Sequence, residues 1–348
     1  MTCISSWRSP SNIALIKYWG KHGVQLPKNP SLSFTLSACH TDMTMQVDNG
    51  SLTPKLTVLY DGNERPAFEP KIKSFFNRIS DQLPWLLHSS IVIDSVNTFP
   101  HGAGIASSAS SMGAMALCIA DIDDQINARP AEVKDSAWWN RVSEFARLGS
   151  GSACRSVFPV SALWGKVDGI SGSNDAYAIP WAEHTSSLYH QYQDTILVVS
   201  AEEKSVSSSM GHELMDEHPY AEKRYADAGK NILSLIDSMK TETAIDQFMS
   251  ICESEALQLH ALMMSGPKPF MLIEPGTISI IKEIWRFRKE SGIPVCFTLD
   301  AGPNVHLLYP LSYKESVLNW IKTNLARHCA DGVFILDEVG SGPQKMEI

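Results

Sequence analysis

A glycine-rich loop that runs into a stretch of small residues is the first place in this sequence where chemistry could occur. Residues 100–109 read Pro-His-Gly-Ala-Gly-Ile-Ala-Ser-Ser-Ala. The first N–H groups of a helix have no partner within the helix, so together with the helix dipole they favour a bound phosphate. Ser107 and Ser108 add hydroxyl donors, or a ligand for a phosphate-bound Mg²⁺. The alternative is a tightly packed helix start whose serines bond only to the backbone.

Two further segments place cations beside glycine. In residues 11–21, Lys17 and Lys21 flank an aromatic pair and a glycine. This spacing fits an anion clamp or, alternatively, two solvated lysines next to buried aromatic rings. Residues 147–156 join a Gly-Ser-Gly-Ser loop to Arg155, whose planar guanidinium can bind an anion through two hydrogen bonds. A linker followed by a surface arginine is the other interpretation of that segment.

A fourth candidate is Asp300, the first residue of Asp-Ala-Gly-Pro-Asn (300–304). An aspartate at this place is usually a turn former, but beside a lysine it could act as a base or an orienting carboxylate. Two phosphate-binding loops in one chain suggest a nucleotide and a second phosphorylated ligand. The motif GxxxxGK[ST] does not occur in the sequence, which excludes a P-loop nucleotide site.

The composition limits which partners these segments can serve. The 348 residues carry a net charge of −9 and are 44% hydrophobic, which predicts a well-packed core. An acidic chain binds nucleic acid and anionic membranes poorly, so an anionic ligand must meet a local basic pocket. The seven cysteines are widely spaced without a CxxC pair, which argues against a zinc site and a disulfide framework. No secretory signal opens the chain, and we expect a cytoplasmic location.

The elements that must position these residues mix strands and helices without strict alternation, which predicts an α+β fold. Residues 95–120 lack charged side chains, but their Pro, His, Ser and Gly content predicts a buried loop and helix, not a membrane span. The polar stretch 182–193 separates two predicted domains, 1–187 and 188–348. Strands are expected over 55–59, 91–93, 195–200, 295–299 and 305–309, and the first of them is followed by a turn at 60–63. Helices are expected over 106–122, 131–148, 220–239, 241–263 and 276–291, and Pro130 stands at the start of the second.

Five motifs in sequence order resemble a known family. The loop at 100–109 resembles the phosphate-binding loop of the GHMP kinase superfamily. The segments NIALIKYWGK (12–21), PxNxSLSxTL (27–36), GSGSACRS (149–156) and DAGPN (300–304) resemble the mevalonate diphosphate decarboxylases within it. The resemblance implies an N-terminal domain like ribosomal protein S5 domain 2, a ferredoxin-like C-terminal domain, and an active-site cleft between them. It also implies a homodimer that works in isoprenoid synthesis.

The resemblance also assigns a role to each matching residue. ATP and (R)-5-diphosphomevalonate would give isopentenyl diphosphate, ADP, phosphate and CO₂. Asp300 would orient and deprotonate the 3-hydroxyl, Lys17 would pair with Asp300, and Arg155 would bind the substrate carboxylate. The remaining residues would bind the substrate (Tyr18, Lys21, Ser150, Ser152 and Ala301), the ATP phosphates (Gly104, Ala106, Ser107, Ser108 and Ser208) and Mg²⁺ (Ser108).

Some features differ from the family, and other activities remain open. Ser209 stands where relatives often carry Arg or Thr, and residues 158–162 lack a usual Gly-Gly. A mevalonate 3-kinase or a phosphomevalonate decarboxylase could share the fold. A non-catalytic nucleotide-binding protein is the more distant alternative, and retention of Asp300, Lys17 and Arg155 argues against it.

Overall fold

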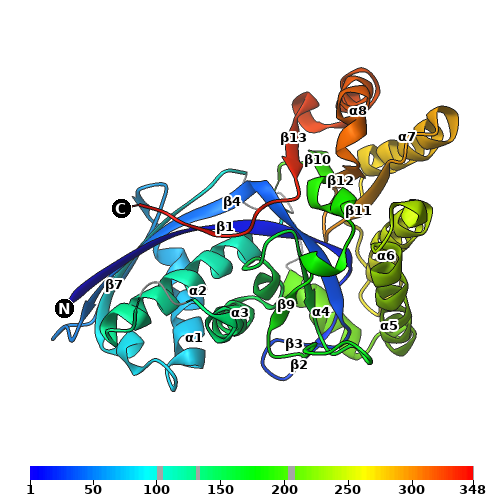
Figure 1. The fold of residues 1–348 in the computed structure, drawn as a ribbon. Coiled ribbons are helices and arrows are strands. Elements are labelled where there is room, and N and C mark those ends of the chain that lie inside the picture. The colour runs from blue at the N-terminus through cyan, green and yellow to red at the C-terminus, as the bar shows by residue number, and fades with distance from the viewer. Residues whose placement is uncertain (100–104, 131–133, 203–207, 348) are drawn as a thin grey trace.

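Two very long strands form the framework of the first half of the chain. The computed structural model describes residues 1–99, 105–130, 134–202 and 208–347. Strand β1 (Thr2–Ile16) pairs antiparallel with β4 (Ser31–Asn49) along nearly its whole length. Burial is mixed at the start of β1 but continuous from Ser9 onward, because the second half of the strand is covered on both faces. Figure 1 shows both strands running from one end of the molecule to its middle.

The large sheet built on these strands has eight strands among the described residues. Its order is β14-β1-β4-β7-β5-β6, and β8 extends it by pairing with β4 on one side and β9 on the other. All pairs are antiparallel except the parallel pair β5–β7. The remaining strands of this sheet are β5 (Leu56–Tyr60), β6 (Asn63–Glu64), β7 (Ser89–Asn97), β8 (Ser161–Trp164), β9 (Ala178–Pro180) and β14 (Gln344–Lys345).

Three helices cover one face of the large sheet (Figure 1). They are α1 (Glu69–Ile79), α2 (Ser107–Ile126) and α3 (Ser136–Gly149). The central helix α2 is rich in alanine and almost wholly buried, since small side chains let it lie close to β1 and β4. This core fixes the start of α2, where the glycine-rich loop ends.

The second half of the chain is a four-stranded antiparallel sheet with helices. The strand order is β11-β12-β10-β13, and Figure 1 places α5 to α8 around it. Its strands are β10 (Gln193–Leu197), β11 (Cys296–Leu299), β12 (Val305–Tyr309) and β13 (Phe334–Glu338). Its helices are α4 (Ser208–Glu213), α5 (Ala221–Ser238), α6 (Ile245–Ser265), α7 (Pro275–Ser291) and α8 (Lys314–Trp320).

A shared hydrophobic core joins the two halves. Ile13 and Leu15 of β1 and Phe34 of β4 pack in one cluster with Ile232 of α5 and Phe248 of α6. The end of β1 is therefore held between the halves, and the residues that follow it enter the space between them. The short hairpin β2 (Lys21–His22) and β3 (Leu26–Pro27) lies directly beyond.

The structure confirms most of the predicted elements and corrects two. The α+β fold, the 295–309 hairpin and the helices at 220–239 and 276–291 are present, and so is a helix over most of 106–122. Residues 131–133 of the predicted helix 131–148 lie outside the described residues. Helix α3 begins at Ser136, because Asp135 caps it by accepting from the Trp138 backbone N–H. The strand predicted at 195–200 spans 193–197. Along the described ranges, no helix is long and apolar enough to cross a membrane.

Candidate active site

The turn at 300–304 lies at the tip of the β11–β12 hairpin, as the sequence predicts. The Gly302 N–H donates to the Asp300 carbonyl at 2.7 Å, and a His260 ring nitrogen lies 3.1 Å from the same oxygen. At the far end of the turn, the Asn304 side chain bonds both backbone groups of Ser200. The tip is thus fixed at both ends, which limits the positions that the partly exposed Asp300 carboxylate can take.

Lys17 follows the last residue of β1 and is 1% exposed. Its Nζ donates to the Ala14 carbonyl at 2.5 Å. The predicted ion pair with Asp300 is not formed in this structure, although the Asp300 charge acts on the lysine and favours its cation. Burial nevertheless dominates and lowers the pKa of Lys17 to about 8. The lysine is therefore a cation at neutral pH whose charge is only loosely compensated.

The backbone of Lys17 is held by a buried ion pair from the second half of the chain. Glu255 accepts from the Lys17 N–H at 2.9 Å, and Arg224 donates to the Lys17 carbonyl at 2.9 Å. Arg224 and Glu255 bond each other at 2.6 Å and are both fully buried. Asn29 completes the arrangement by donating to the Lys17 carbonyl. The clamp fixes the peptide of Lys17 relative to helices α5 and α6.

Arg155 is a buried cation, and no described carboxylate forms an ion pair with it. It is 2% exposed, and its Nε lies 3.3 Å from the Asn12 side-chain oxygen and 3.1 Å from the Ser33 hydroxyl. Its NH1 donates to Ser31 at 2.6 Å, and the guanidinium lies over the Trp164 ring. These neutral partners orient the planar group without neutralising it. A buried positive charge with such partners is stabilised by an anionic ligand.

Lys17, Asp300 and Arg155 form one electrostatic group. The negative charge of Asp300 favours the charged state of Lys17 and of Arg155, whereas the positive charge of Arg155 disfavours the charged state of Lys17. The three residues come from the end of β1, the β11–β12 turn and the segment after α3. The structure therefore places the three residues that the sequence predicted as catalytic within electrostatic reach of one another.

Tyr18 lies beside this group and has an unused hydroxyl. Its ring packs on Trp164, with centroids 4.7 Å apart, and its buried hydroxyl has no partner among the described residues. Burial raises the pKa of Tyr18 well above its usual value, so the hydroxyl remains a donor. A Cβ at Gly151 would come within 2.8 Å of this oxygen, so glycine is needed there. An unpartnered buried hydroxyl in a site points to a ligand.

The other predicted substrate residues lie on β2, on the β11–β12 turn and in the segment after α3. Lys21 is half-buried on β2, and Ala301 packs beside Trp19. Ser150 precedes a short 3₁₀ helix (Gly151–Arg155) that contains Ser152. The Ser150 hydroxyl lies 3.4 Å from the Ser108 hydroxyl, which links the Gly-Ser-Gly-Ser loop to the start of α2.

The start of α2 has the features of a phosphate site. Ala106 adopts a left-handed conformation with φ 45° and offers no side-chain oxygen to cap the helix. Ser107 is half-buried and Ser108 is exposed, so the first turn is accessible to a ligand. Gly104 and the side chain of Ser208 lie outside the described residues, so their predicted roles remain predictions.

A magnesium site made of protein ligands alone is not found in the described part of the chain. No group of three or more His, Cys, Asp or Glu residues there could hold a metal ion. Mg²⁺ often keeps several waters and binds mainly through nucleotide phosphates. The exposed Ser108 at the start of α2 fits that mode of binding.

Sequence reasoning missed three residues at this site. Arg224 and Glu255 lie on the buried stripes of α5 and α6, where a charge on an otherwise apolar helix face was an available signal. His212 of α4 packs against both Tyr18 and Trp19, with ring centroids 4.3 and 4.8 Å apart. No pattern in the sequence pointed to His212.

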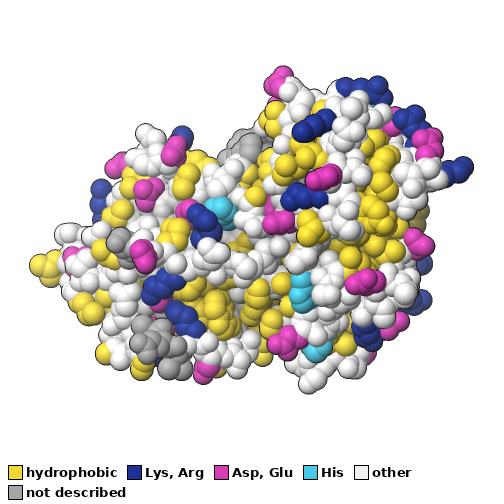
Figure 2. Space-filling model, turned by 45° about the horizontal axis from the view of Figure 1, so that its top comes forward, with side chains coloured by type: hydrophobic (Ala, Val, Ile, Leu, Met, Phe, Trp, Pro, Cys, Tyr) yellow, Lys and Arg dark blue, Asp and Glu magenta, His cyan; other side chains and the backbone are white. Residues whose placement is uncertain are grey.

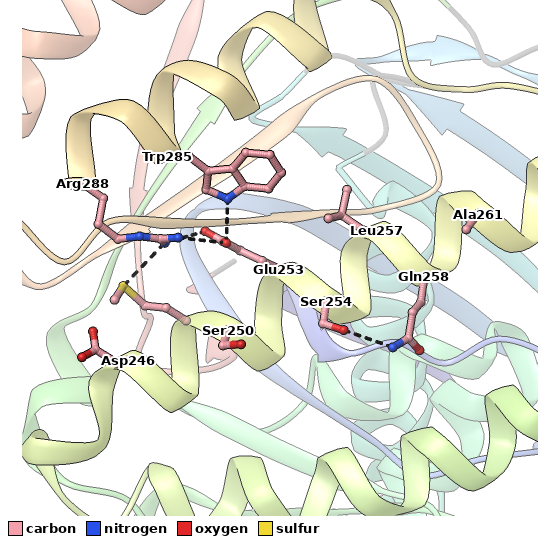
Figure 3. Close-up of a pocket in the computed structure, with 10 residues that line it drawn as sticks. Asp246, Ser250, Glu253, Ser254, Leu257, Gln258, Ala261, Trp285 and Arg288 are labelled. Carbon is pink, nitrogen blue, oxygen red and sulfur yellow. Dashed lines mark hydrogen bonds and ion pairs between the residues drawn. The ribbon is translucent and has the colours of Figure 1, made fainter. Parts of the chain in front are cut away.

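A second hollow lies outside this site. It has a volume of about 640 Å³ between the outer face of α6 and α7 (Figure 3). Glu253 already pairs with Arg288 at 2.7 Å and accepts from the Trp285 ring nitrogen at 2.8 Å. The charged groups in the middle of this hollow therefore neutralise each other and leave no charge for a ligand. On the face shown in Figure 2, acidic and basic side chains are mixed.

Comparison with known protein families covers almost the whole chain. Residues 9–178 match the diphosphomevalonate decarboxylase-like N-terminal domain, and residues 195–345 match the mevalonate 5-diphosphate decarboxylase C-terminal domain. The diphosphomevalonate decarboxylase of Danio rerio is 30% identical over 323 residues, which cover 87% of this chain and 75% of that protein. The Ganoderma lucidum enzyme of the same name is 28% identical over 334 residues, covering 90% of this chain and 80% of that one.

Solved structures of this family show the same fold. Mevalonate diphosphate decarboxylase from Staphylococcus aureus has a TM-score of 0.85 at 24% identity, covering 100% of this chain and 99% of that one. A structure of MDDEF in complex with MVAPP, AMPPCP and magnesium has a TM-score of 0.82 at 28% identity, with 100% of both chains covered.

Proposed function

This chain belongs to the diphosphomevalonate decarboxylase family, and from that premise we propose how it works as an enzyme. It converts (R)-5-diphosphomevalonate and ATP to isopentenyl diphosphate, ADP, phosphate and CO₂. One observation carries the assignment to this site: two buried cations, Lys17 and Arg155, and the Asp300 carboxylate act on one another electrostatically. The mixed α/β architecture and the matched structures support the same conclusion.

The reaction needs a leaving group because no electron-sink cofactor takes part. The 3-hydroxyl oxygen attacks the γ-phosphorus of ATP, and ADP leaves with the bonding electron pair. Asp300, fixed at the hairpin tip, orients this hydroxyl and accepts its proton. The Lys17 cation, held in place by the Arg224–Glu255 pair, offsets the charge that develops near the transferred phosphoryl group.

Elimination follows phosphorylation. The phosphate leaves carbon 3 with its electron pair, the bond between the carboxylate and carbon 2 breaks, and its electrons form the new double bond. Arg155 holds the substrate carboxylate with the edge of its guanidinium that Asn12, Ser31 and Ser33 do not use. The diphosphate of the substrate is bound by Tyr18, Lys21, Ser150 and Ser152.

ATP is held at the start of α2. Gly104, Ala106, Ser107, Ser108 and Ser208 bind its phosphates. Mg²⁺, which Ser108 is placed to bind together with those phosphates, supplies charge neutralisation when bound. Complexes of MDDEF with AMPPCP and magnesium support this part of the proposal by similarity.

The assembly and location of the enzyme are also proposed from the family resemblance. We expect a homodimer in the cytoplasm, with a domain boundary at 187/188. The two family matches end and begin on either side of that boundary, at 178 and 195. Analytical ultracentrifugation would test the dimer, because a single species at the monomer mass over micromolar concentrations would contradict it.

Product stoichiometry tests the reaction itself. We expect one ADP and one CO₂ for each diphosphomevalonate consumed, with Mg²⁺ required, because phosphorylation and elimination occur in one site. Parallel assays on mevalonate and mevalonate 5-phosphate would show whether the diphosphate is preferred. ADP release without CO₂ would identify a 3-kinase instead, and no ADP release with any of the three would identify a non-catalytic protein.

The pH dependence of the reaction reports on Lys17. Because burial lowers its pKa to about 8, the ammonium is present at neutral pH and is lost as the pH rises through that value. We therefore expect kcat/KM to fall above about pH 8, since this parameter follows groups of the free enzyme. The nearby thiols do not explain such a fall, because burial raises the pKa of Cys154 and Cys252. A flat kcat/KM between pH 7 and 9.5 would contradict the role of the lysine.

A further inference from the structure

His212 has one ring nitrogen engaged and the other available. The ring is 9% exposed, and its Nδ1 accepts from the Gly20 N–H at 3.0 Å. Nδ1 must therefore be unprotonated, which places the proton of the neutral ring on Nε2. No described residue accepts a hydrogen bond from Nε2. Desolvation by burial and the nearby Lys21 lower the pKa of His212 to about 3, so the ring stays neutral under physiological conditions.

The packing around His212 fixes the direction of this donor. The imidazole packs against the rings of both Tyr18 and Trp19. Trp19 in turn lies so close to Gly211 that a Cβ there would come within 2.3 Å of the indole. The hydrogen bond from the Gly20 N–H to Nδ1 opposes a flip of the ring about its Cβ–Cγ bond. The result is a rigid, neutral donor close to Tyr18 and Lys21, two residues that the proposed function assigns to the substrate.

His212 lines a cavity of about 320 Å³ together with Lys21 and Lys28. The Lys21 ammonium has one long bond of 3.4 Å, to Gln25, among the described residues. Glu213 and Asp216 line the same cavity and would repel an anion. Lys21, Lys28 and His212 are the lining residues that could bind one. The ring of Tyr18 packs against His212 at a tilt, and its hydroxyl has no partner among the described residues.

We propose that His212 is a substrate-binding residue that donates its Nε2–H to the diphosphate of the substrate beside Lys21. This inference rests on the proposed function, because it takes the phosphorylated tail of diphosphomevalonate as the ligand. A neutral donor binds the phosphate without adding a third cation next to Lys21 and Lys28. It also explains why a buried histidine is held in one tautomer.

Two substitutions separate the binding role from a purely structural one. His212→Asn places an amide oxygen near the position of Nδ1, which keeps the acceptor for Gly20 but removes the donor. His212→Gln places an amide N–H₂ near Nε2, which keeps the donor but loses the acceptor. A hydrogen bond to a charged group changes binding by about 10- to 100-fold. We expect His212→Asn to raise the KM for diphosphomevalonate by at least about 10-fold and His212→Gln by about 3-fold or less.

Controls connect the effect to the diphosphate. The KM for ATP should stay within about 3-fold of wild type in both variants, and the exposed His184→Asn should change neither KM. An unchanged KM for diphosphomevalonate in His212→Asn, or equal impairment of the two variants, would overturn the proposal. The second result would mean that His212 only supports Gly20 and the aromatic rings.

A measurement on the unmodified protein covers the case in which the variants do not fold. In ¹⁵N-histidine-labelled wild type, addition of inorganic pyrophosphate should shift the Nε2–H signal of His212 while Nδ1 remains unprotonated. An unshifted Nε2 signal at saturating pyrophosphate would contradict the inference. If wild type released no ADP or CO₂ but this shift occurred, the proposed function would fail while the anion site remained.

Discussion

Asp300→Asn should lower the release of both ADP and CO₂ by at least about 10³-fold, because loss of a general base alone costs about 10²- to 10⁴-fold. The substitution keeps the size and hydrogen bonding of the side chain but removes the proton acceptor and the negative charge that acts on Lys17 and Arg155. Both products should fall together, since elimination needs the phosphorylated intermediate. Binding of ATP and diphosphomevalonate should stay within several-fold of wild type.

The variant is expected to fold, because the bonds that fix the hairpin tip use the Asp300 backbone carbonyl and not its carboxylate. Asp61→Asn is a matched control, since Asp61 is an exposed aspartate in another hairpin turn, with φ 52°. Its activity should equal that of wild type. If ADP release survived in Asp300→Asn while CO₂ release vanished, Asp300 would act only in elimination. If both survived, Asp300 would be only a turn former.

Arg155→Lys should reduce turnover by about 10²-fold or more, which corresponds to loss of a charge-assisted pair worth about 3 kcal/mol. Lysine keeps the positive charge but lacks the planar group that bonds Asn12, Ser31 and Ser33 on one side and leaves an edge for the carboxylate on the other. The buried ammonium would also lack the stacking on Trp164. Steady-state turnover with saturating ATP and diphosphomevalonate measures the effect.

Arg8→Lys serves as the comparison for this change. Arg8 pairs with Asp42 on the partly exposed part of β1, where a screened ion pair contributes little. Turnover of Arg8→Lys should match wild type. Near-normal turnover of Arg155→Lys, with circular dichroism showing a folded protein, would mean that Arg155 is only a structural cation.

The candidate site could be predicted from the sequence where short motifs define their own geometry. The Asp300 turn is held by local residues between two apolar strands, and the start of α2 follows a glycine-rich loop. These features depend on neighbours within a few residues. The grouping of Asp300, Lys17 and Arg155, by contrast, was predicted only through the family resemblance, because they are brought together by the packing of the two halves of the chain.

Other features depend on contacts between distant residues and were not predictable. The long strand β1 was missed because its second half is buried on both faces, which removes the alternation that identifies a strand. The Lys17 backbone is bonded by Arg224 and Glu255, which follow it in the chain by 207 and 238 positions, respectively. The start of α3 at Ser136 depends on a hydrogen bond from the Trp138 N–H to the Asp135 side chain, which the sequence pattern did not reveal.

The central claim, that the 3-hydroxyl is phosphorylated before elimination, can be tested by following its oxygen. Diphosphomevalonate labelled with ¹⁸O at the 3-hydroxyl is incubated with ATP and the wild-type enzyme, and the released inorganic phosphate is analysed by mass spectrometry. If the hydroxyl attacks the γ-phosphorus and later leaves as part of the phosphate, each phosphate carries one ¹⁸O atom. Unlabelled phosphate, released together with ADP and CO₂, would show that ATP is hydrolysed without phosphorylating the substrate and would contradict the mechanism.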